Sequence, residues 1–143
     1  MTKRSSIPWF TILIASLCIG MYFWQYYLRA TNHLDLEIYT RLGAPSTLKL
    51  YQGQYWGVFW NSFLHSAWQL LAFNLIGIIY FGSIIERRTN FLNLFVLGFL
   101  ASTITSLVQL GLTDDAGIGM TGANYFFMSY IIGRSVKDET FKI

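Results

Sequence analysis

One apolar stretch constrains the fold more than any other part of the sequence. Residues 64–85 are mostly apolar, and about 22 such residues are enough for a helix to cross the hydrocarbon core of a bilayer. An aromatic and amide-rich segment precedes the stretch, and Glu86, Arg87 and Arg88 follow it. Aromatic and basic residues are typical of the two interfaces of a membrane span. The stretch therefore predicts a transmembrane helix.

Polar residues interrupt this predicted helix where a simple anchor would carry Leu or Ile. The clearest are His65 and Asn74. A polar side chain at membrane depth is costly and normally faces protein or water. Asn74 shares one helical stripe with Leu70, Gly77 and Phe81. We therefore expect this stripe to face the protein interior, with Gly77 as a helix-packing position.

The composition indicates a multi-pass membrane protein. Of the 143 residues, 54% are hydrophobic and only 12% are charged, which is too little charge for an ordinary soluble domain. The apolar runs predict one all-α membrane domain over residues 1–143. Its expected parts are transmembrane helices over residues 8–28, 64–85, 91–111 and 121–133, a long, partly structured outer loop over residues 29–60, and a cytoplasmic tail over residues 134–143.

The basic residues predict the orientation of this domain. Seven of the ten Lys and Arg residues fall at the chain ends and after the second helix, and three fall in the long loop. This bias predicts that both termini are cytoplasmic, so the net charge of +3 reflects membrane orientation and not nucleic-acid binding. The first apolar run is longer than a signal-peptide core and has no small-residue cleavage site, so we expect it to be retained.

The third predicted helix carries small and polar residues along one face. These are Gly98, Ser102, Thr105, Ser106 and Gln109, at offsets of 0, 4, 7, 8 and 11 residues. Such stripes allow helices to approach closely and to form hydrogen bonds across the interface. We expect Gly98, Ser102 and Ser106 to be helix-packing positions.

The last apolar run is too short to cross the membrane from one surface to the other. Residues 121–133 span about 20 Å as a helix, against roughly 30 Å of hydrocarbon. If Arg134 lies at the inner surface, the helix begins below the outer surface, and the preceding residues 117–120 are non-helical at membrane depth. Such backbone is tolerated only inside protein or beside a water-filled cavity. This argument places Thr121 at a helix N-terminus next to a cavity.

Two blocks of sequence resemble the rhomboid family of intramembrane serine proteases, roughly over residues 40–133. The first block contains Tyr55-Trp56, Phe63-Leu64-His65, Phe73-Asn74, Phe81-Gly82-Ser83 and Glu86-Arg87-Arg88, and the second contains Gly119-Met120-Thr121-Gly122 with Tyr125. The second block is similar to the Gly-x-Ser-Gly motif of the family and its following tyrosine. The resemblance implies a rhomboid core in which the chain supplies the first four helices.

The resemblance also implies roles for individual residues. Thr121 stands at the position of the serine nucleophile, and Asn74 and Gly119 stand where oxyanion donors are expected. His65 would form a hydrogen bond with the first loop, and charge pairing of Glu86 and Arg88 would hold the inner turn. Structural positions in the same motifs are Gly122 and Tyr125.

Departures from the family pattern decide the expected function. Thr121 replaces serine, Leu70 replaces the oxyanion histidine, and the family's catalytic base on a sixth helix has no counterpart in a chain that ends after the fourth. Trp56 is followed by Gly57 and not by the family's arginine. Only two histidines, His33 and His65, are present, and a His65–Thr121 pair is the less favoured interpretation of His65.

We therefore expect a catalytically inactive rhomboid-like protein that binds or positions transmembrane helices as a subunit of a membrane complex. A partner or a second copy would cover the polar faces of Thr121 and of the third helix, giving a homo- or hetero-oligomer in membrane lipids. The alternative is a rhomboid-type endopeptidase, either as a fragment or with a histidine from another chain. A third possibility is a degenerating gene product that has no selected role. We expect no cofactor and no metal, because the sequence has no Walker loop and no Cys or His cluster with metal-ligand spacing.

Overall fold

The computed structural model describes residues 7–32, 39, 41–44, 46–113, 117–138 and 141, and every regular element among them is helical. The all-α prediction is confirmed. The elements in chain order are α1 (Trp9–Asn32), α3 (Thr47–Tyr51), α4 (Gly57–Trp60), the 3-10 helix η1 (Asn61–Phe63), α5 (Trp68–Gly77), the π-helical turn η2 (Ile78–Gly82), α6 (Ser83–Arg88), α7 (Phe91–Thr113) and α8 (Thr121–Ser135).

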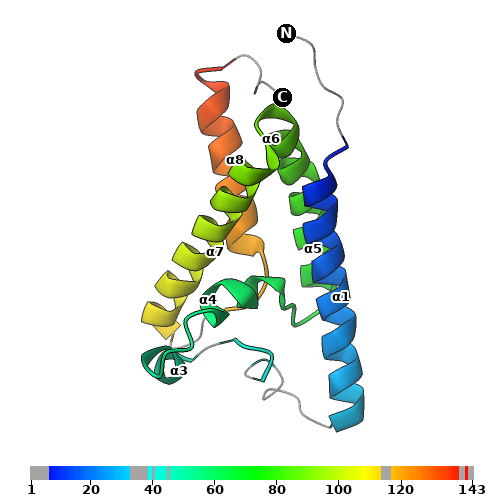
Figure 1. Cartoon of the computed structure of the whole chain (residues 1–143), viewed down its shortest axis with the longest axis vertical. Helices are drawn as coiled ribbons and strands as arrows, with labels where there is room; N and C mark the ends of the chain where they lie inside the picture. Colours follow the sequence, from blue (N-terminus) through cyan, green and yellow to red (C-terminus); the bar gives the residue numbers. More distant parts are fainter. Residues whose placement is uncertain are drawn as a thin grey trace.

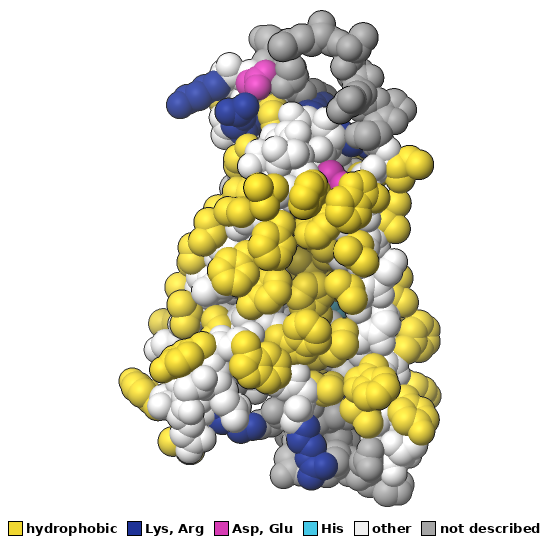
Figure 2. All heavy atoms as spheres, in the orientation of Figure 1, with side chains coloured by type: hydrophobic (Ala, Val, Ile, Leu, Met, Phe, Trp, Pro, Cys, Tyr) yellow, Lys and Arg dark blue, Asp and Glu magenta, His cyan; other side chains and the backbone are white. Residues whose placement is uncertain are grey.

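Three helical segments among the described residues are long and apolar enough to cross a bilayer. They are Trp9–Thr31, Trp68–Arg88 and Phe91–Thr113. Figure 2 shows hydrophobic side chains covering the middle of the molecule, with Lys and Arg gathered towards its two ends. This distribution fits a protein embedded in a membrane. Helix α8 has 15 residues and is too short to count among these spans, so the fourth crossing stays a prediction.

The second span begins later than the sequence predicts. Leu64 is extended, with φ −87° and ψ 142°, and α5 starts only at Trp68. Leu64 and His65 are fully buried, and the backbone N–H of His65 donates to Gln25 Oε1 at 3.3 Å. Because α1 supplies this acceptor, His65 does not need a helical partner. His65 therefore precedes the helix that was expected to contain it.

The first helix and the long loop also differ from their predicted bounds. Helix α1 continues to Asn32, so the first four residues assigned to the outer loop are helical. The loop carries α3 and α4, which agrees with the expectation of partial structure. Figure 1 shows α1 and α7 diverging from the α6 end of the molecule, with α4 lying across the space between them.

The small and polar face of α7 packs against other residues of the same chain. A Cβ added to Gly98 would lie 3.4 Å from Phe127 of α8, and Ser102 is 2% exposed. Ser106 is 5% exposed and donates to Asn61 Oδ1 at 3.2 Å. These three residues are therefore buried within the chain, with α8 against Gly98 and η1 against Ser106, and a partner for the rest of this face stays a prediction.

Glu86 joins the end of the second span to the beginning of the first. Its carboxylate accepts the backbone N–H groups of Phe10 at 3.0 Å and Thr11 at 2.8 Å, and the Thr11 hydroxyl at 2.7 Å. The first N–H groups of a helix have no partner within the helix, and the positive end of the helix dipole favours a carboxylate there. Glu86 thus caps α1, a role that the sequence did not indicate.

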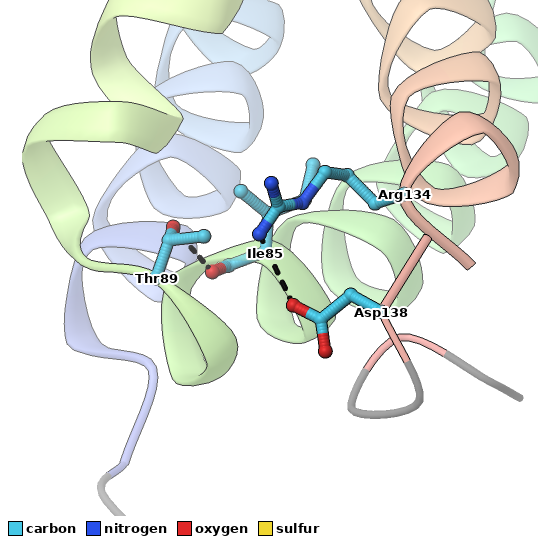
Figure 3. A network of polar contacts seen from close by, with 4 residues as sticks. All are labelled: Ile85, Thr89, Arg134 and Asp138. Atoms are coloured by element: carbon cyan, nitrogen blue, oxygen red, sulfur yellow. Dashed lines mark hydrogen bonds and ion pairs between the residues drawn. The ribbon is translucent and has the colours of Figure 1, made fainter. Parts of the chain in front are cut away.

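Two local polar contacts lie at the α6 end of the molecule, one at the end of α6 and one at the end of α8 (Figure 3). Arg134 forms an ion pair with Asp138 at 3.1 Å, and Thr89 Oγ1 donates to the Ile85 carbonyl at 2.7 Å. The guanidinium groups of Arg88 and Arg134 lie 5.5 Å and 5.2 Å from the ring centre of Phe141, which is buried. These cation–π contacts fix the end of α6 to the segment after α8.

Candidate functional site

Thr121 lies at the N-terminus of α8, as the length of the last apolar run predicts. The preceding residues are non-helical, with φ +64° at Gly117 and φ +95° at Gly119, a region that glycine adopts without strain. Asn61 holds this segment with two hydrogen bonds. Its carbonyl accepts the N–H of Gly119 at 3.1 Å, and its Nδ2 donates to the carbonyl of Gly117 at 2.9 Å.

A buried amide network joins α5 to α8. Thr121 Oγ1 donates to Asn74 Oδ1 at 3.1 Å, and Asn124 Nδ2 donates to the same oxygen at 3.2 Å and to the Asn74 carbonyl at 3.1 Å. Asn74 is 0% exposed and Asn124 is 5% exposed. A Cβ at Gly77 would lie 2.6 Å from the Asn124 side chain, so Gly77 makes the space that Asn124 fills.

Asn124 was not among the residues chosen from the sequence. The available signal was its position three residues after Thr121, which puts both side chains on one face of α8. That signal identifies a shared face, but it does not identify Asn74 as the partner.

His65 lies close to Gly119 in the segment that precedes α8. Its Nδ1 is 3.2 Å from the carbonyl oxygen of Phe63, which can only accept, so Nδ1 carries the proton and Nε2 presents a lone pair. Nε2 is buried and has no hydrogen-bond partner among the described residues, and it lies 3.6 Å from the position of a Cβ on Gly119. Asn74 Nδ2 is 3.0 Å from the same position. Burial lowers the pKa of His65, and its hydrogen bond to Phe63 offsets part of this effect.

Two cavities meet at Thr121. A polar cavity of about 210 Å³ lies between α7 and the segment before α8, lined by Thr105, Gln109 and Gly119 among others. A second, apolar cavity of about 250 Å³ lies between α5, η2 and α8, and we call it the α5–α8 groove. Residues lining it are Phe73, Ile76, Phe81, Thr121, Tyr125 and Met128.

The predicted site residues thus fall into two groups. Thr121, Asn74, His65 and Gly119 come together around the start of α8. The others lie elsewhere or serve packing: Gly122 contacts Thr105, Tyr125 is 59% exposed in the α5–α8 groove, Glu86 caps α1 and Arg88 lies over Phe141.

The Thr121 hydroxyl is positioned by its hydrogen bond to Asn74. A hydroxyl nucleophile needs a neighbouring base to take its proton. The Thr121 proton is directed at an amide oxygen, which is not a base at physiological pH. His33 lies outside the described residues. Within the described part of the chain, no group of three or more His, Cys, Asp or Glu residues could hold a metal ion.

Comparison with known proteins agrees with the sequence motifs. The Rhomboid domain family model matches residues 52–141. The Rhomboid protease GlpG of Klebsiella pneumoniae subsp. pneumoniae and the protein of the same name from Klebsiella pneumoniae strain 342 are each 26% identical over 137 residues. The alignments cover 96% of this chain and 48% of each relative, so the chain spans about half the length of the curated relatives it matches.

Proposed function

Because the chain belongs to the rhomboid family, we propose that it is a catalytically inactive member that holds a transmembrane helix of another segment or protein in the α5–α8 groove. The observation that carries this proposal is the hydrogen bond from Thr121 Oγ1 to Asn74 Oδ1. Through this hydrogen bond, the residue at the position of the family's nucleophile links α8 to α5.

The size of the catalytic loss favours binding over proteolysis. In a well-studied serine protease, removing the nucleophile or the base alone costs on the order of 10⁶ in turnover. Here Thr121 replaces the serine, its hydroxyl donates to an amide, and Leu70 cannot donate a hydrogen bond to an oxyanion. The extra methyl group of threonine also crowds the approach of a carbonyl carbon.

The α5–α8 groove supports the choice of a helix as ligand. Phe73, Ile76 and Tyr125 are 59%, 69% and 59% exposed, and they rim an apolar cavity at membrane depth. Lipid tails are as apolar as these side chains, so helix association there depends on close packing and on polar contacts between helices. The groove offers both, because Thr121 and Asn124 lie in its lining.

The alternative is an intramembrane endopeptidase, as a fragment or with a histidine supplied by another chain. One observation favours it: Nε2 of His65 is buried and has no hydrogen-bond partner among the described residues, and it lies 3.6 Å from the position of a Cβ on Gly119. Both relatives are named rhomboid proteases, although this chain covers only 48% of each.

Photocrosslinking in the membrane tests the proposal. A photoreactive amino acid replaces Phe73 in the groove in one variant and Ile104 of α7, which is 51% exposed, in a matched control. We expect a discrete protein adduct from Phe73 and none from Ile104. Equal adducts at both positions, or lipid adducts alone, would contradict helix binding.

A cleavage assay separates the two functions. The purified chain and its crosslinked complex are incubated with a transmembrane substrate, and the wild type is compared with Thr121→Ala. We expect no cleavage above background from either protein. Cleavage that disappears in Thr121→Ala would establish the endopeptidase and overturn the inactive assignment.

A further inference from the structure

Charge is distributed unevenly along this chain. The segments 1–8, 86–90 and 134–143 hold seven of the ten basic residues and three of the seven acidic ones, whereas residues 29–60 and 113–117 hold three basic and four acidic residues. The first group therefore carries a net charge of +4 and the second a net charge of −1. The described parts of the first group lie at the α6 end of the molecule, where α1 begins and α8 ends (Figure 1).

The α6 end lies at the border of the apolar surface. Helix α8 carries no charged residue before Arg134, which follows Gly133 near its end. Trp9 in the first turn of α1 is 54% exposed, and an exposed tryptophan at a helix end is typical of the lipid head-group level. Figure 2 shows Lys and Arg side chains at this end, beyond the hydrophobic side chains that cover the middle of the molecule. The cations therefore lie at the depth of the lipid phosphates.

Two cations at the end of α8 have donors available for a ligand. Lys137 is exposed, and its ammonium group forms no hydrogen bond or ion pair within the described part of the chain. The side chain of Arg134 is 47% exposed and donates to Asp138 Oδ2 at 3.1 Å (Figure 3), which uses one of the five N–H donors of a guanidinium. The backbone N–H of Lys137 donates to the Arg134 carbonyl at 3.0 Å, so the two cations are one turn apart.

The guanidinium of Arg134 is already held in place. It lies 5.2 Å from the ring centre of Phe141, and the guanidinium of Arg88 lies 5.5 Å from the same ring. Phe141 is 1% exposed, and its ring packs edge to face with Tyr130 at 6.0 Å. A long side chain loses rotamer freedom when it binds a ligand. Because the ring and Asp138 restrict Arg134 beforehand, less freedom is lost when its remaining N–H groups bind an anion.

The described carboxylates at this end do not cancel these charges. Glu86 is 9% exposed, and its carboxylate accepts the N–H groups at the start of α1. Asp138 balances Arg134, so Lys137 keeps a full positive charge one turn away. A phosphodiester carries one negative charge, and its oxygens can accept charge-assisted hydrogen bonds from both cations.

We propose that Arg134 and Lys137 bind the phosphate of an anionic phospholipid in the leaflet at the α6 end. The ligand is a lipid and not free phosphate, because the two cations lie at the edge of the apolar surface, where acyl chains hold head-group phosphates. Membrane orientation alone requires basic residues at this end without preferring one position, whereas a binding site requires these two. Neither residue lines the α5–α8 groove, so the site is independent of the proposed function.

Native mass spectrometry of the full chain tests this site. The protein in detergent is titrated with phosphatidylglycerol and, separately, with phosphatidylcholine of the same acyl chains, and the fraction of protein that carries a lipid gives each affinity. We expect phosphatidylglycerol to bind about fivefold more tightly or better, and an excess of inorganic phosphate not to displace it. Equal affinities would overturn the preference for an anionic head group. Displacement by inorganic phosphate would overturn the choice of a lipid.

Matched variants locate the site. We expect Lys137→Gln to weaken phosphatidylglycerol binding about fivefold, the effect of one basic residue near an anionic membrane surface, and to leave phosphatidylcholine binding unchanged. Arg87→Gln is the control, because it makes the same charge change at an exposed residue of the same end and should have little effect. Asp138→Asn should strengthen phosphatidylglycerol binding, since it releases Arg134 from its carboxylate partner.

Two results with these variants would contradict the site. One is an equal loss of phosphatidylglycerol affinity in Arg87→Gln and Lys137→Gln, which would show attraction to the net charge and not to a particular pair. The other is an affinity of Asp138→Asn at or below that of the wild type. Arg87 and Lys137 are exposed, so their substitution should not prevent folding, and thermal unfolding of each variant in the same detergent checks this.

Discussion

At the scale of single residues, Asn74 is the side chain on which the site depends. Its Oδ1 accepts hydrogen bonds from both Thr121 and Asn124, and its carbonyl accepts a third from Asn124. In an apolar surrounding, a polar group that loses its partner costs more than the bond itself contributes. Removing one member of the network therefore weakens the whole contact between α5 and α8, because the remaining polar groups are left buried without partners.

We expect Gly77→Ala to destabilise the protein by about 1–3 kcal/mol through overpacking. The new Cβ would lie 2.6 Å from the side chain of Asn124, which its hydrogen bonds to Asn74 hold in place. Gly20→Ala is the control, because nothing lies within 4 Å of a Cβ at Gly20 in α1. Unfolding in mixed detergent micelles measures both, and equal stability of the two variants would contradict the close contact.

His65 predicts a pH dependence of stability. Burial lowers the pKa of the folded ring below its ordinary value of 6.5, so the unfolded chain takes up the proton at higher pH than the folded protein does. The contribution is fully present above pH 6.5 and is lost as the pH falls through the folded pKa. We expect the free energy of unfolding to decrease from about pH 7.5 to about pH 5.5. His65→Gln should show a smaller decrease, and an unchanged pH profile in that variant would exclude His65 as the source.

At the scale of elements, the short helix α8 and the capped start of α1 show how the core is joined. Helix α8 packs along α7 through small residues, where Gly122 lies against Thr105 and Gly98 against Phe127. Helix α1 has no acidic residue in its own first turn and takes its cap from Glu86, at a separation of 75 residues or more. Each contact attaches one helix to a distant part of the chain.

Loss of the Glu86 cap should loosen α1 in particular. Hydrogen bonds to charged groups contribute about 1.5–3 kcal/mol, so we expect Glu86→Leu to destabilise the protein by at least that amount. Amide hydrogen exchange at Phe10 and Thr11 should accelerate more than exchange in α7, because their N–H groups lose the carboxylate. Arg87→Gln at an exposed neighbouring position is the control. Uniform acceleration in all helices would argue against a local capping role.

At the scale of the whole molecule, the ends of the helices show which parts of the chain lie together. Helix α1 begins and α8 ends beside α6, whereas α3 and α4 lie at the other end (Figure 1). This arrangement agrees with the basic-residue pattern that predicts both termini on one side. It does not say which side is cytoplasmic, so the orientation stays a prediction.

Cysteine labelling tests that orientation. In a Cys18→Ala background, single cysteines replace Ile7, Tyr51 or Val136, which are 74%, 85% and 81% exposed. We expect a membrane-impermeant maleimide added outside intact cells to label Tyr51→Cys and to spare the other two. Labelling of all three variants after permeabilisation shows that the cysteines are reactive. Labelling of Ile7→Cys from outside would reverse the predicted topology.

Local sequence patterns were sufficient to predict the three long apolar helices and the position of one site residue, Thr121. Apolar run lengths identified the helices that are long enough to span a membrane, because hydrocarbon thickness sets the length of a span. The short run after residue 120 placed Thr121 at a helix start, since a 15-residue helix cannot cross alone and Gly117 and Gly119 interrupt the backbone before it. These are properties of neighbouring residues in one segment.

The contacts that complete the site depended on tertiary structure. The start of α5 at Trp68 follows from burial of Leu64 and from the bond between His65 and Gln25, which lie 40 residues apart. Thr121 and Asn74 are 47 residues apart, and Asn124 reaches Asn74 across 50. Helical periodicity shows which side chains share a face, but which faces meet is decided only when the packed helices bring distant donors and acceptors within hydrogen-bonding distance.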